Sequence, residues 1–400
     1  MRGKQLRFLF LNVGHFLDHY FMLIFATVAA LRLTTEWDLS YAELIPYATP
    51  GFIAFGVCAI PAGWLADKWS REGMMLIFFF GIGLSSVLTS FANSPLEIAL
   101  SLTLIGIFAA IYHPVGLAMV VQGRTKTGMA LAINGIFGNM GVACAALLTG
   151  FLIDTAGWRS AFVLSGVVAI CIGMLYWFFI SGQNKIVANA SASASATQHI
   201  ESSDYSRATL IRVFGIIFFT TAIGGLIFQS TTFALPKVFE ERLSDFASTA
   251  TLIGWYTFIV FSVAAFAQLV VGYLVDHYSV RIVFACVAIL QAVFFALMIQ
   301  LYGVAALIVA IAFMLVVFGQ IPINDVLVGR MVRSEWRSRA YGIRYIVTFS
   351  VMASAVPFIA WVHNEWGFST LFGLLAVAAV LIFAAALFLP KLEKAGNATA

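Results

Sequence analysis

The sequence predicts an all-α polytopic membrane protein with twelve transmembrane helices arranged as two pseudo-symmetric six-helix bundles. Hydrophobic residues make up 62% of the chain and charged residues only 10%, whereas soluble domains average about 45–50% and 25%. Long runs such as residues 74–92 are uniformly apolar and match the ~20 residues that cross a bilayer as a helix. A transmembrane β-barrel would need alternating segments of about ten residues instead. An internal repeat divides the twelve runs into two sets of six.

The repeat is visible at two landmarks. A short charged hinge, residues 63–71, returns as residues 272–279, in both places between two apolar runs. The matched hinge positions, 209 residues apart, are Gly63 with Gly272, Asp67 with Asp276, and Ser70 with Ser279. Trp158 and Trp366, each at the start of an apolar run, lie 208 residues apart. Two landmarks at nearly one offset indicate a duplicated half.

The apolar runs and their boundary residues place the helices in order. Ser40 and Glu43 form a Ser-x-x-Glu capping box at the start of the second helix. The predicted spans are residues 7–33, 41–66, 73–92, 95–121, 127–153, 158–180, 208–235, 247–275, 280–301, 303–329, 338–361 and 367–389.

These spans predict a domain organisation of an N-terminal bundle (1–180), a linker (181–207) and a C-terminal bundle (208–400). The linker is polar and rich in Ser, Ala and Asn, so it has too little apolar content to pack and is expected to be flexible.

The positions of the basic residues predict the orientation. The loops on one side hold only Arg32, Arg159, Lys237 and Arg242. All other lysines and arginines, apart from Arg344, lie at the termini, in the linker or in the loops of the other side. The positive-inside rule therefore places both termini and the linker in the cytoplasm of a bacterial cell, with the protein in the inner membrane. No cleavable signal peptide is expected, because the first apolar run is long and carries Asp18.

Composition and motifs exclude several classes of function. The net charge of +4 is modest and the basic residues form no stripe, so nucleic acid is not an expected partner. The four cysteines lie in apolar runs without metal-ligand spacing. No nucleophile–base pair, phosphate loop or metal-ligand cluster can be assembled, so neither an enzyme nor a cofactor is expected. The expected partners are a small-molecule substrate, protons and the lipid bilayer, the energy source is a proton gradient, and the chain is expected to be monomeric.

The hinge resembles the signature Gly-x-Leu-Ala-Asp-Arg-x-Gly-Arg-[Arg/Lys] of the major facilitator superfamily. Residues that match are Gly63, Leu65, Ala66, Asp67 and Arg71; Lys68 is a conservative replacement, and Ser70 and Glu72 depart from the signature. Membership would imply two bundles related by a pseudo-two-fold axis, a central cavity near the middle of the membrane, and alternating access by rocking.

A looser resemblance points to the fosmidomycin-resistance type of bacterial exporter. It rests on residues 15–18, His-Phe-Leu-Asp, and on His113-Pro114. Drug–proton antiporters usually carry Gly-Pro-x-x-Gly-Gly in the fifth helix. Here the fifth span has a face of small residues without a proline, namely Gly135, Gly138, Gly141 and Gly150. That departure leaves the direction of transport open.

The resemblance also implies a gating role for the hinge. In the family, the hinge aspartate contacts the eleventh helix in the outward-open state, which would bring Asp67 to residues 338–340 with Arg71 in the same charge network. By the repeat, Asp276 would meet the start of the fifth helix near Thr127, with Arg281 beside it. The alternative is that these are ordinary loop charges that stabilise helix ends by about 0.3–1 kcal/mol.

Two ionisable residues are predicted to lie deep in the membrane. Asp18 is 11 residues after Arg7, and His113 is 11 residues before Arg124. At 1.5 Å per residue both lie about 16 Å from the cytoplasmic boundary, near the midplane. Such costly groups are usually functional, which suggests proton exchange at Asp18 assisted by His113 or His19. The alternative is that the histidines only form hydrogen bonds across a helix interface.

His15, Asp18 and His19 share one helix face, because their spacing is i, i+3 and i+4. With His113 opposite, they offer the imidazole and carboxylate ligands of a transition-metal site. Two histidines one turn apart are a weak signal without ligands from another helix, and no thiolate or further acidic cluster supports the site. Metal transport is therefore a minor alternative, and no resident metal is expected.

The last anomaly is Arg344, inside the eleventh span. It lies five residues beyond Arg339, and Asp325 lies five before Arg330, so an ion pair between Arg344 and Asp325 is one interpretation. A counter-charge for an anionic substrate is the other. Neutral candidates for hydrogen bonds to a substrate in the cavity, besides His15, are Asn134, Asn139, Gln229, Gln320 and Asn324.

The sequence thus predicts a proton-coupled secondary transporter that exports a small amphipathic compound or drug. A proton-coupled importer of an organic anion is the alternative within transport, and a non-transporting receptor of the same fold is the alternative outside it. The deep Asp18 and Arg344 argue against the receptor, which has no need of such costly groups.

Overall fold

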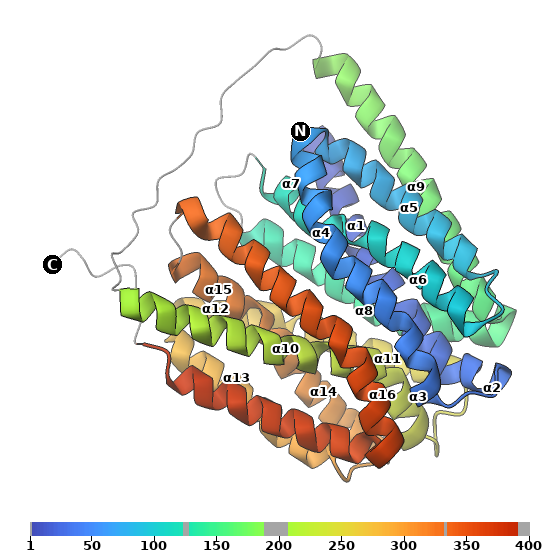
Figure 1. The fold of residues 1–400 in the computed structure, drawn as a ribbon, viewed down its shortest axis with the longest axis vertical. Helices are drawn as coiled ribbons and strands as arrows, with labels where there is room; N and C mark the ends of the chain where they lie inside the picture. The colour runs from blue at the N-terminus through green and yellow to red at the C-terminus, as the bar shows by residue number, and fades with distance from the viewer. Residues whose placement is uncertain (1, 123–127, 188–206, 332–333, 391–400) are drawn as a thin grey trace.

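The computed structural model describes residues 2–122, 128–187, 207–331 and 334–390, and these residues are helical almost throughout (Figure 1). The N-terminal half contains α1 (Arg2–Val28), the π-helix η1 (Ala29–Leu33), α2 (Thr34–Glu36), α3 (Tyr41–Leu44), the 3₁₀-helix η2 (Ile45–Ala48), α4 (Thr49–Lys68), α5 (Arg71–Thr89), α6 (Pro95–Ala109), the π-helix η3 (Tyr112–Gly116), α7 (Leu117–Val121), α8 (Gly128–Ala156) and α9 (Trp158–Val187). The C-terminal half contains α10 (Arg207–Arg242), α11 (Ala250–Ala265), α12 (Ala267–His277), α13 (Val280–Met298), α14 (Gly303–Gly319), α15 (Ile321–Met331) and α16 (Ser334–Leu387).

The spans agree with the predicted fold. Eleven helical stretches in the described residues are long and apolar enough to cross a membrane. The last of them, Ile346–Leu387, contains two predicted spans that meet at Gly367. Gly367 has φ 74°, a left-handed conformation that glycine adopts without the penalty of a side chain. The chain turns back there, so α16 holds the eleventh and twelfth helices.

The two halves repeat the same helix pairings, which is the structural form of the duplication. In the N-terminal half α1 packs on α8, α5 on α9, and α4 on α6. In the C-terminal half the corresponding pairs are α10 on α16, α13 on α16, and α11 on α14. In Figure 1 the blue-to-green helices α1 to α9 and the yellow-green-to-red helices α10 to α16 form two adjoining groups.

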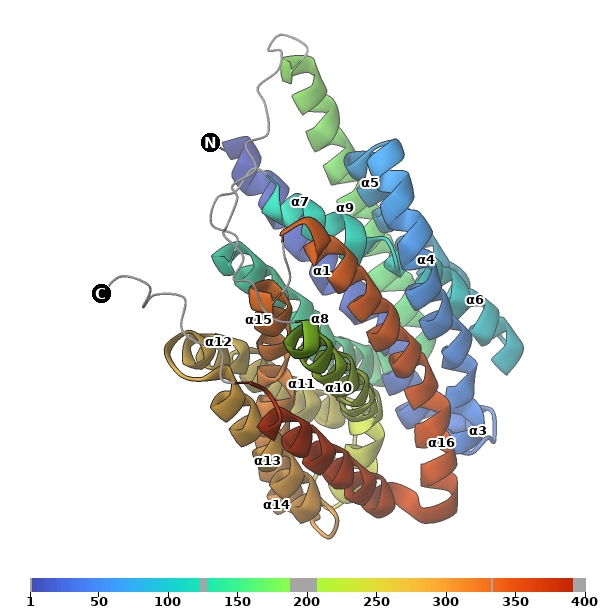
Figure 2. The same cartoon turned by 60° about the vertical axis from the view of Figure 1, so that its left-hand side comes forward.

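The halves meet along two seams, α8 against α11 and α4 against α16 (Figure 2). On the first seam, a Cβ added to Gly254 would come within 2.6 Å of the Ala146 carbonyl oxygen, and one added to Gly150 would meet the Ala250 carbonyl. Glycine is therefore required for the close approach, as is usual where helices pack in a membrane. Gly150 belongs to the predicted small-residue face of the fifth span.

Two spans are interrupted at matching levels. The fourth span passes from α6 through η3, which contains Pro114, to α7. The tenth passes from α14 to α15, with Pro322 at the start of α15. Proline removes a backbone donor and disturbs the preceding turn, and its positions 208 residues apart repeat the break in both halves.

The boundary between the N-terminal bundle and the linker differs from the prediction. Helix α9 continues past the predicted end at residue 180 to Val187, because residues 181–187 continue the helix without a glycine or proline after Gly182 to end it. The rest of the predicted linker, residues 188–206, lies outside the described residues. Below, the end of the fold at which α1 begins and α9 ends is called the termini end, and the end with the α8–α9 and α10–α11 connections is called the distal end.

Candidate functional site

A polar cluster lies in the interior of the N-terminal half, on α1. The three polar positions predicted from the i, i+3, i+4 spacing do share one face there. His15 is buried, His19 is half-buried, and Asp18 has no exposed surface. The remainder of this stretch of α1 is apolar and packs on α8, so helix packing on both sides holds the polar face in place.

Asp18 meets His113, as their predicted depth allowed. The Asp18 Oδ2 atom lies 3.3 Å from His113 Nδ1, and 11% of the His113 side chain is exposed. Neither carboxylate oxygen of Asp18 has a hydrogen-bond partner of good geometry among the described residues. An ionised carboxylate in such a place is costly unless it is paired or hydrated. The histidine is therefore its main electrostatic partner.

The backbone at His113 is unusual. His113 and Pro114 lie in the π-helix η3, and single π-helical turns are frequent at functional sites. The His113 ring contacts the rings of Phe55 and Phe349, with centroids 5.7 and 5.6 Å away. Phe55 is on α4 and Phe349 on α16, so His113 stands behind the α4–α16 seam where the halves meet.

A hydrogen-bond network fixes the other side of the cluster. The His15 Nδ1 atom lies 2.8 Å from the Asn134 carbonyl oxygen. The Asn134 side-chain amide donates to Asn12 Oδ1 and to the Tyr112 hydroxyl, both at 2.9 Å. The Tyr112 hydroxyl in turn donates to the Leu11 carbonyl at 2.8 Å. Asn134 is fully buried, so it positions α1 against α8 and η3. The sequence analysis did not single out Asn12 or Tyr112.

The other neutral residues predicted to line the cavity have buried amide side chains. Gln320 accepts a hydrogen bond from Gln291 Nε2 at 2.8 Å. Asn139, Gln229, Gln320 and Asn324 each keep a buried side-chain atom that has no hydrogen-bond partner among the described residues. Buried polar atoms are rarely left in this state, and a polar solute or water would satisfy them.

The N-terminal hinge contains the predicted charge pair. Arg71 donates to Asp67 Oδ1 at 2.8 Å, with 35% and 67% of their side chains exposed. Glu72, which departs from the signature, forms an ion pair with Arg7 of α1, and Ser70 caps α5. Exposed pairs of this kind contribute about 0.3–0.5 kcal/mol. The predicted partner residues 338–340 lie outside the described side chains.

The predicted gating residues of the C-terminal hinge have different surroundings from those of the N-terminal hinge. Asp276 is exposed at the end of α12, and its predicted partner Thr127 lies outside the described residues. Arg281 lines a groove between α13 and the end of α16, with Ile282 and Phe383, and not a seam between the halves. The side chains of Asp325 and Arg344 lie outside the described part of the chain, so their predicted pairing stays a prediction.

The polar contacts that join the halves at the distal end were not predicted from the sequence. Asp154 of α8 accepts hydrogen bonds from the Thr251 amide at 2.7 Å and from the Thr251 hydroxyl at 2.5 Å. Thr251 lies in the first turn of α11, where free amide groups favour a carboxylate. An acid at the end of one span and hydroxyls at the start of another were visible in the sequence, but nothing there paired them.

A second distal contact joins α3, α10 and α16. The Tyr41 ring lies 5.4 Å from the His363 ring and 6.4 Å from the Phe368 ring. His363 Nε2 lies 2.9 Å from Glu241 Oε1, and Lys237 lies 3.8 Å from the same oxygen. Together with Asp154 and Thr251, these residues tie the halves together at the distal end.

The comparisons with known proteins agree with the fold. A family model described as Major Facilitator Superfamily matches residues 11–244 and 217–399. The gallate transporter of Pseudomonas putida is 28% identical over 168 residues, which are 42% of this chain and 37% of the relative. The 4-hydroxybenzoate transporter PcaK of Pseudomonas aeruginosa is 22% identical over 235 residues, which are 58% of this chain and 50% of the relative. The multidrug resistance protein MdtG of Proteus mirabilis is 24% identical over 218 residues, or 54% of this chain and 52% of that protein.

A solved structure supports the fold over nearly the whole chain. The crystal structure of a D-xylose–proton symporter superposes with a TM-score of 0.74 at 14% identity and covers 96% of this chain and 97% of the symporter. The sequence matches are shorter: the chain spans only 37% and 33% of the lengths of the first two curated relatives that it matches. The resemblance to fosmidomycin-resistance exporters stays a prediction.

Proposed function

The chain belongs to the major facilitator superfamily, and from this premise we propose that it is a proton-coupled secondary transporter that moves a small organic solute by alternating access. One observation carries the proposal: Asp18 is fully buried, and its Oδ2 atom lies 3.3 Å from His113 Nδ1. A carboxylate and an imidazole at membrane depth are groups that exchange protons, and ionisable groups there are usually functional.

The coupling follows from where the pair stands. His113 lies behind the α4–α16 seam, against Phe349 of the other half. Rocking of the halves would change the hydration of His113, and with it the free-energy cost of a charge on Asp18. A proton taken up on one side of the membrane would then be released on the other. Rocking of the two halves is expected from membership of the family, and the buried Asp18–His113 pair is the group that would respond to it.

The structure has the distal end joined by the contact of Asp154 with Thr251 and by the Tyr41 ring against His363, which in turn contacts Glu241 within the C-terminal half. Hydrogen bonds and ion pairs of exposed groups contribute little net free energy and can be exchanged for water. They therefore suit a gate that opens and closes. We assign the termini end to the cytoplasm, on the charge asymmetry of the loops, in the inner membrane of a bacterium.

A small organic anion is the substrate class that this site suits best. The one carboxylate of the cluster has no exposed surface, so it is not available to hold a cationic solute. The polar groups that keep some exposure are the imidazoles of His19 and His113, which can donate to an anion. Several of the relatives are named as transporters of organic acids, among them gallate and 4-hydroxybenzoate. Arg344 would add a counter-charge.

Export of an amphipathic compound is the second candidate. It is favoured by the aromatic residues around His113, among them Phe55 and Phe349, and by the similarity to MdtG. The two candidates differ in the charge of the solute and in whether it travels with or against the proton.

The test uses purified protein in proteoliposomes with a pH-sensitive dye inside. Under a pH gradient, wild-type protein should accumulate gallate or 4-hydroxybenzoate with co-directional proton flux, whereas export would show counter-directional flux with an amphipathic drug such as puromycin. Arg344→Gln should raise KM for anions; if Arg344 only pairs with Asp325, adding Asp325→Asn should restore KM. Solute movement without proton flux, at every solute tried, would contradict the proposal.

A further inference from the structure

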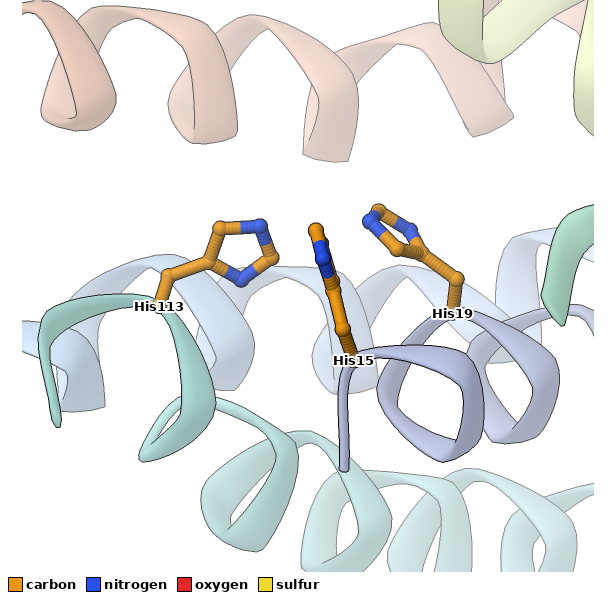
Figure 3. A group of neighbouring side chains, drawn as sticks. All are labelled: His15, His19 and His113. Carbon is orange, nitrogen blue, oxygen red and sulfur yellow. The ribbon is translucent and has the colours of Figure 1, made fainter. Parts of the chain in front are cut away.

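Three imidazoles from two elements converge beside the Asp18 carboxylate. Figure 3 shows His15 and His19 rising from α1 and His113 from η3, with all three rings on the same side of these helices. Each ring offers one nitrogen atom, and these atoms all lie within 4.8 Å of one another. The ring centroids are 5.0 to 5.5 Å apart. The sequence supplied two of these histidines on one helix face, and folding adds the third from another element.

A polar neighbour of each of two rings, a hydrogen-bonded carbonyl for His15 and the Asp18 carboxylate for His113, indicates which ring nitrogen is available. His15 Nδ1 lies 2.8 Å from a carbonyl oxygen, that of Asn134. Since a carbonyl only accepts, Nδ1 carries the proton and the lone pair is on Nε2. His113 Nδ1 faces the Asp18 carboxylate at 3.3 Å, which favours the same tautomer. Histidines that bind metals almost always donate their other ring nitrogen to a carbonyl or a carboxylate.

The surroundings of the cluster also fit. A Cβ on Gly138 would come within 2.7–2.9 Å of His15 Nε2, Cε1 and Cδ2, so the absence of a side chain there makes room for the His15 ring against α8. Neither oxygen of Asp18 has a hydrogen-bond partner of good geometry, so the carboxylate is free to support the His113 ring. Packing alone does not require a matched pair of acceptors behind two rings.

We propose that His15, His19 and His113 bind one divalent transition-metal ion of the Zn²⁺ class, with Asp18 and the Asn134 carbonyl as outer-shell partners. Imidazole nitrogen selects Zn²⁺, Co²⁺, Ni²⁺ or Cu²⁺ over Mg²⁺ and Ca²⁺. Nitrogen ligands at 2.0–2.1 Å from Zn²⁺ are about 3.4 Å apart in a tetrahedron, so small rotations of the rings complete the site. Three protein ligands leave a fourth position for water or an anionic group.

A consequence for transport rests on the proposed function. A metal ion held by His15, His19 and His113 would occupy the imidazole nitrogen of His113 that the proposed coupling uses, and would fix η3 to α1. Micromolar Zn²⁺ would therefore inhibit proton-coupled transport, and a chelator would reverse the inhibition.

The binding test uses the full chain purified in detergent with an affinity tag that contains no histidine. Zn²⁺ is titrated by calorimetry, and Co²⁺ by its ligand-field absorption, which reports tetrahedral coordination. Wild-type protein should bind one ion. His15→Ala, His19→Ala and His113→Ala should each lower the affinity at least tenfold, and Asp18→Asn about 10–100-fold as an outer-shell change. His277→Ala, which alters an exposed histidine on α12, should bind like wild type.

Thermal unfolding of each variant without metal separates loss of binding from loss of folding. Equal affinity in wild type and all three cluster variants would overturn the metal site, as would octahedral Co²⁺ spectra typical of oxygen ligands. The two proposals fail separately. Proton flux with no Zn²⁺ binding removes the metal site and leaves the transporter, whereas Zn²⁺ binding with no proton flux removes proton coupling and leaves the site.

Discussion

The two halves of the chain share one arrangement of helices and differ in the chemistry of their buried polar side chains. Their interrupted spans match at Pro114 and Pro322. Beside the first break the N-terminal half buries an acid and histidines, Asp18 with His113 among them. Among the described side chains near the second break, the C-terminal half has neutral amides such as Gln320. The scaffold thus determines where polar groups can be buried, and the residue type decides whether a position can carry a proton.

The largest effect is expected from removing the acid. Asp18→Asn should abolish accumulation against a gradient while downhill exchange continues, because the amide cannot carry the coupled proton. One proton moving down about one pH unit supplies about 1.4 kcal/mol, or tenfold accumulation. The loss of accumulation is measured as solute uptake into proteoliposomes with and without a pH gradient. If uphill transport survives, the proton site is elsewhere and the division between the halves is wrong.

The next effect concerns the amide pair of the C-terminal half. Gln320→Ala should raise KM several-fold with the proton-to-solute ratio unchanged, and should destabilise the protein by about 1–3 kcal/mol because the buried Gln291 amide loses one of its two acceptors, the other being the Val316 carbonyl. The double variant Gln291→Leu/Gln320→Leu is the control, since it leaves neither amide unpaired. It should recover the stability and keep the high KM. A change in the proton-to-solute ratio in either variant would place coupling in both halves.

A smaller effect is expected where the halves touch at the distal end. Asp154→Ala removes a carboxylate from the first turn of α11 and should cost about 1 kcal/mol, as loss of a helix cap does. Hydrogen exchange of the Thr251 amide should then be about fivefold faster. Thr155→Ala is the matched control, because the Thr155 hydroxyl donates to the Phe151 carbonyl of its own helix. Unchanged exchange in Asp154→Ala would show that this contact does not hold the distal end.

The smallest effects should separate the two hinges. Asp67→Asn should slow transport about two- to fivefold, the range that 0.3–1 kcal/mol allows, with no loss of folded protein because the Arg71 pair is exposed. Asp276→Asn should slow transport less, since the second hinge has Val280 where the first has Arg71. Initial rates at equal amounts of inserted protein measure both. Equal losses of transport rate in the two variants would contradict the expected difference between the two hinges.

Prediction from the sequence worked best where one-dimensional spacing carries the information. Counting residues from Arg7 and Arg124 placed Asp18 and His113 at one depth, and the structure brings them to 3.3 Å. Spacing along a helix does not reveal which neighbour a side chain meets, so it could not show that Arg281 of the second hinge lines an outer groove. The Tyr112–Asn134–Asn12 network was missed for the same reason.

The sequence alone determined the number of spans, their duplication and the depth of their charges, because the bilayer fixes helix length and makes buried charge costly. Only the tertiary structure decided which atoms meet. Packing of α8 on α11 sets the Asp154 carboxylate on an amide 97 residues away, and packing of η3 on α1 brings His113 to the face of His15 and His19. Such contacts depend on the positions of whole helices in three dimensions, which spacing along the chain does not specify.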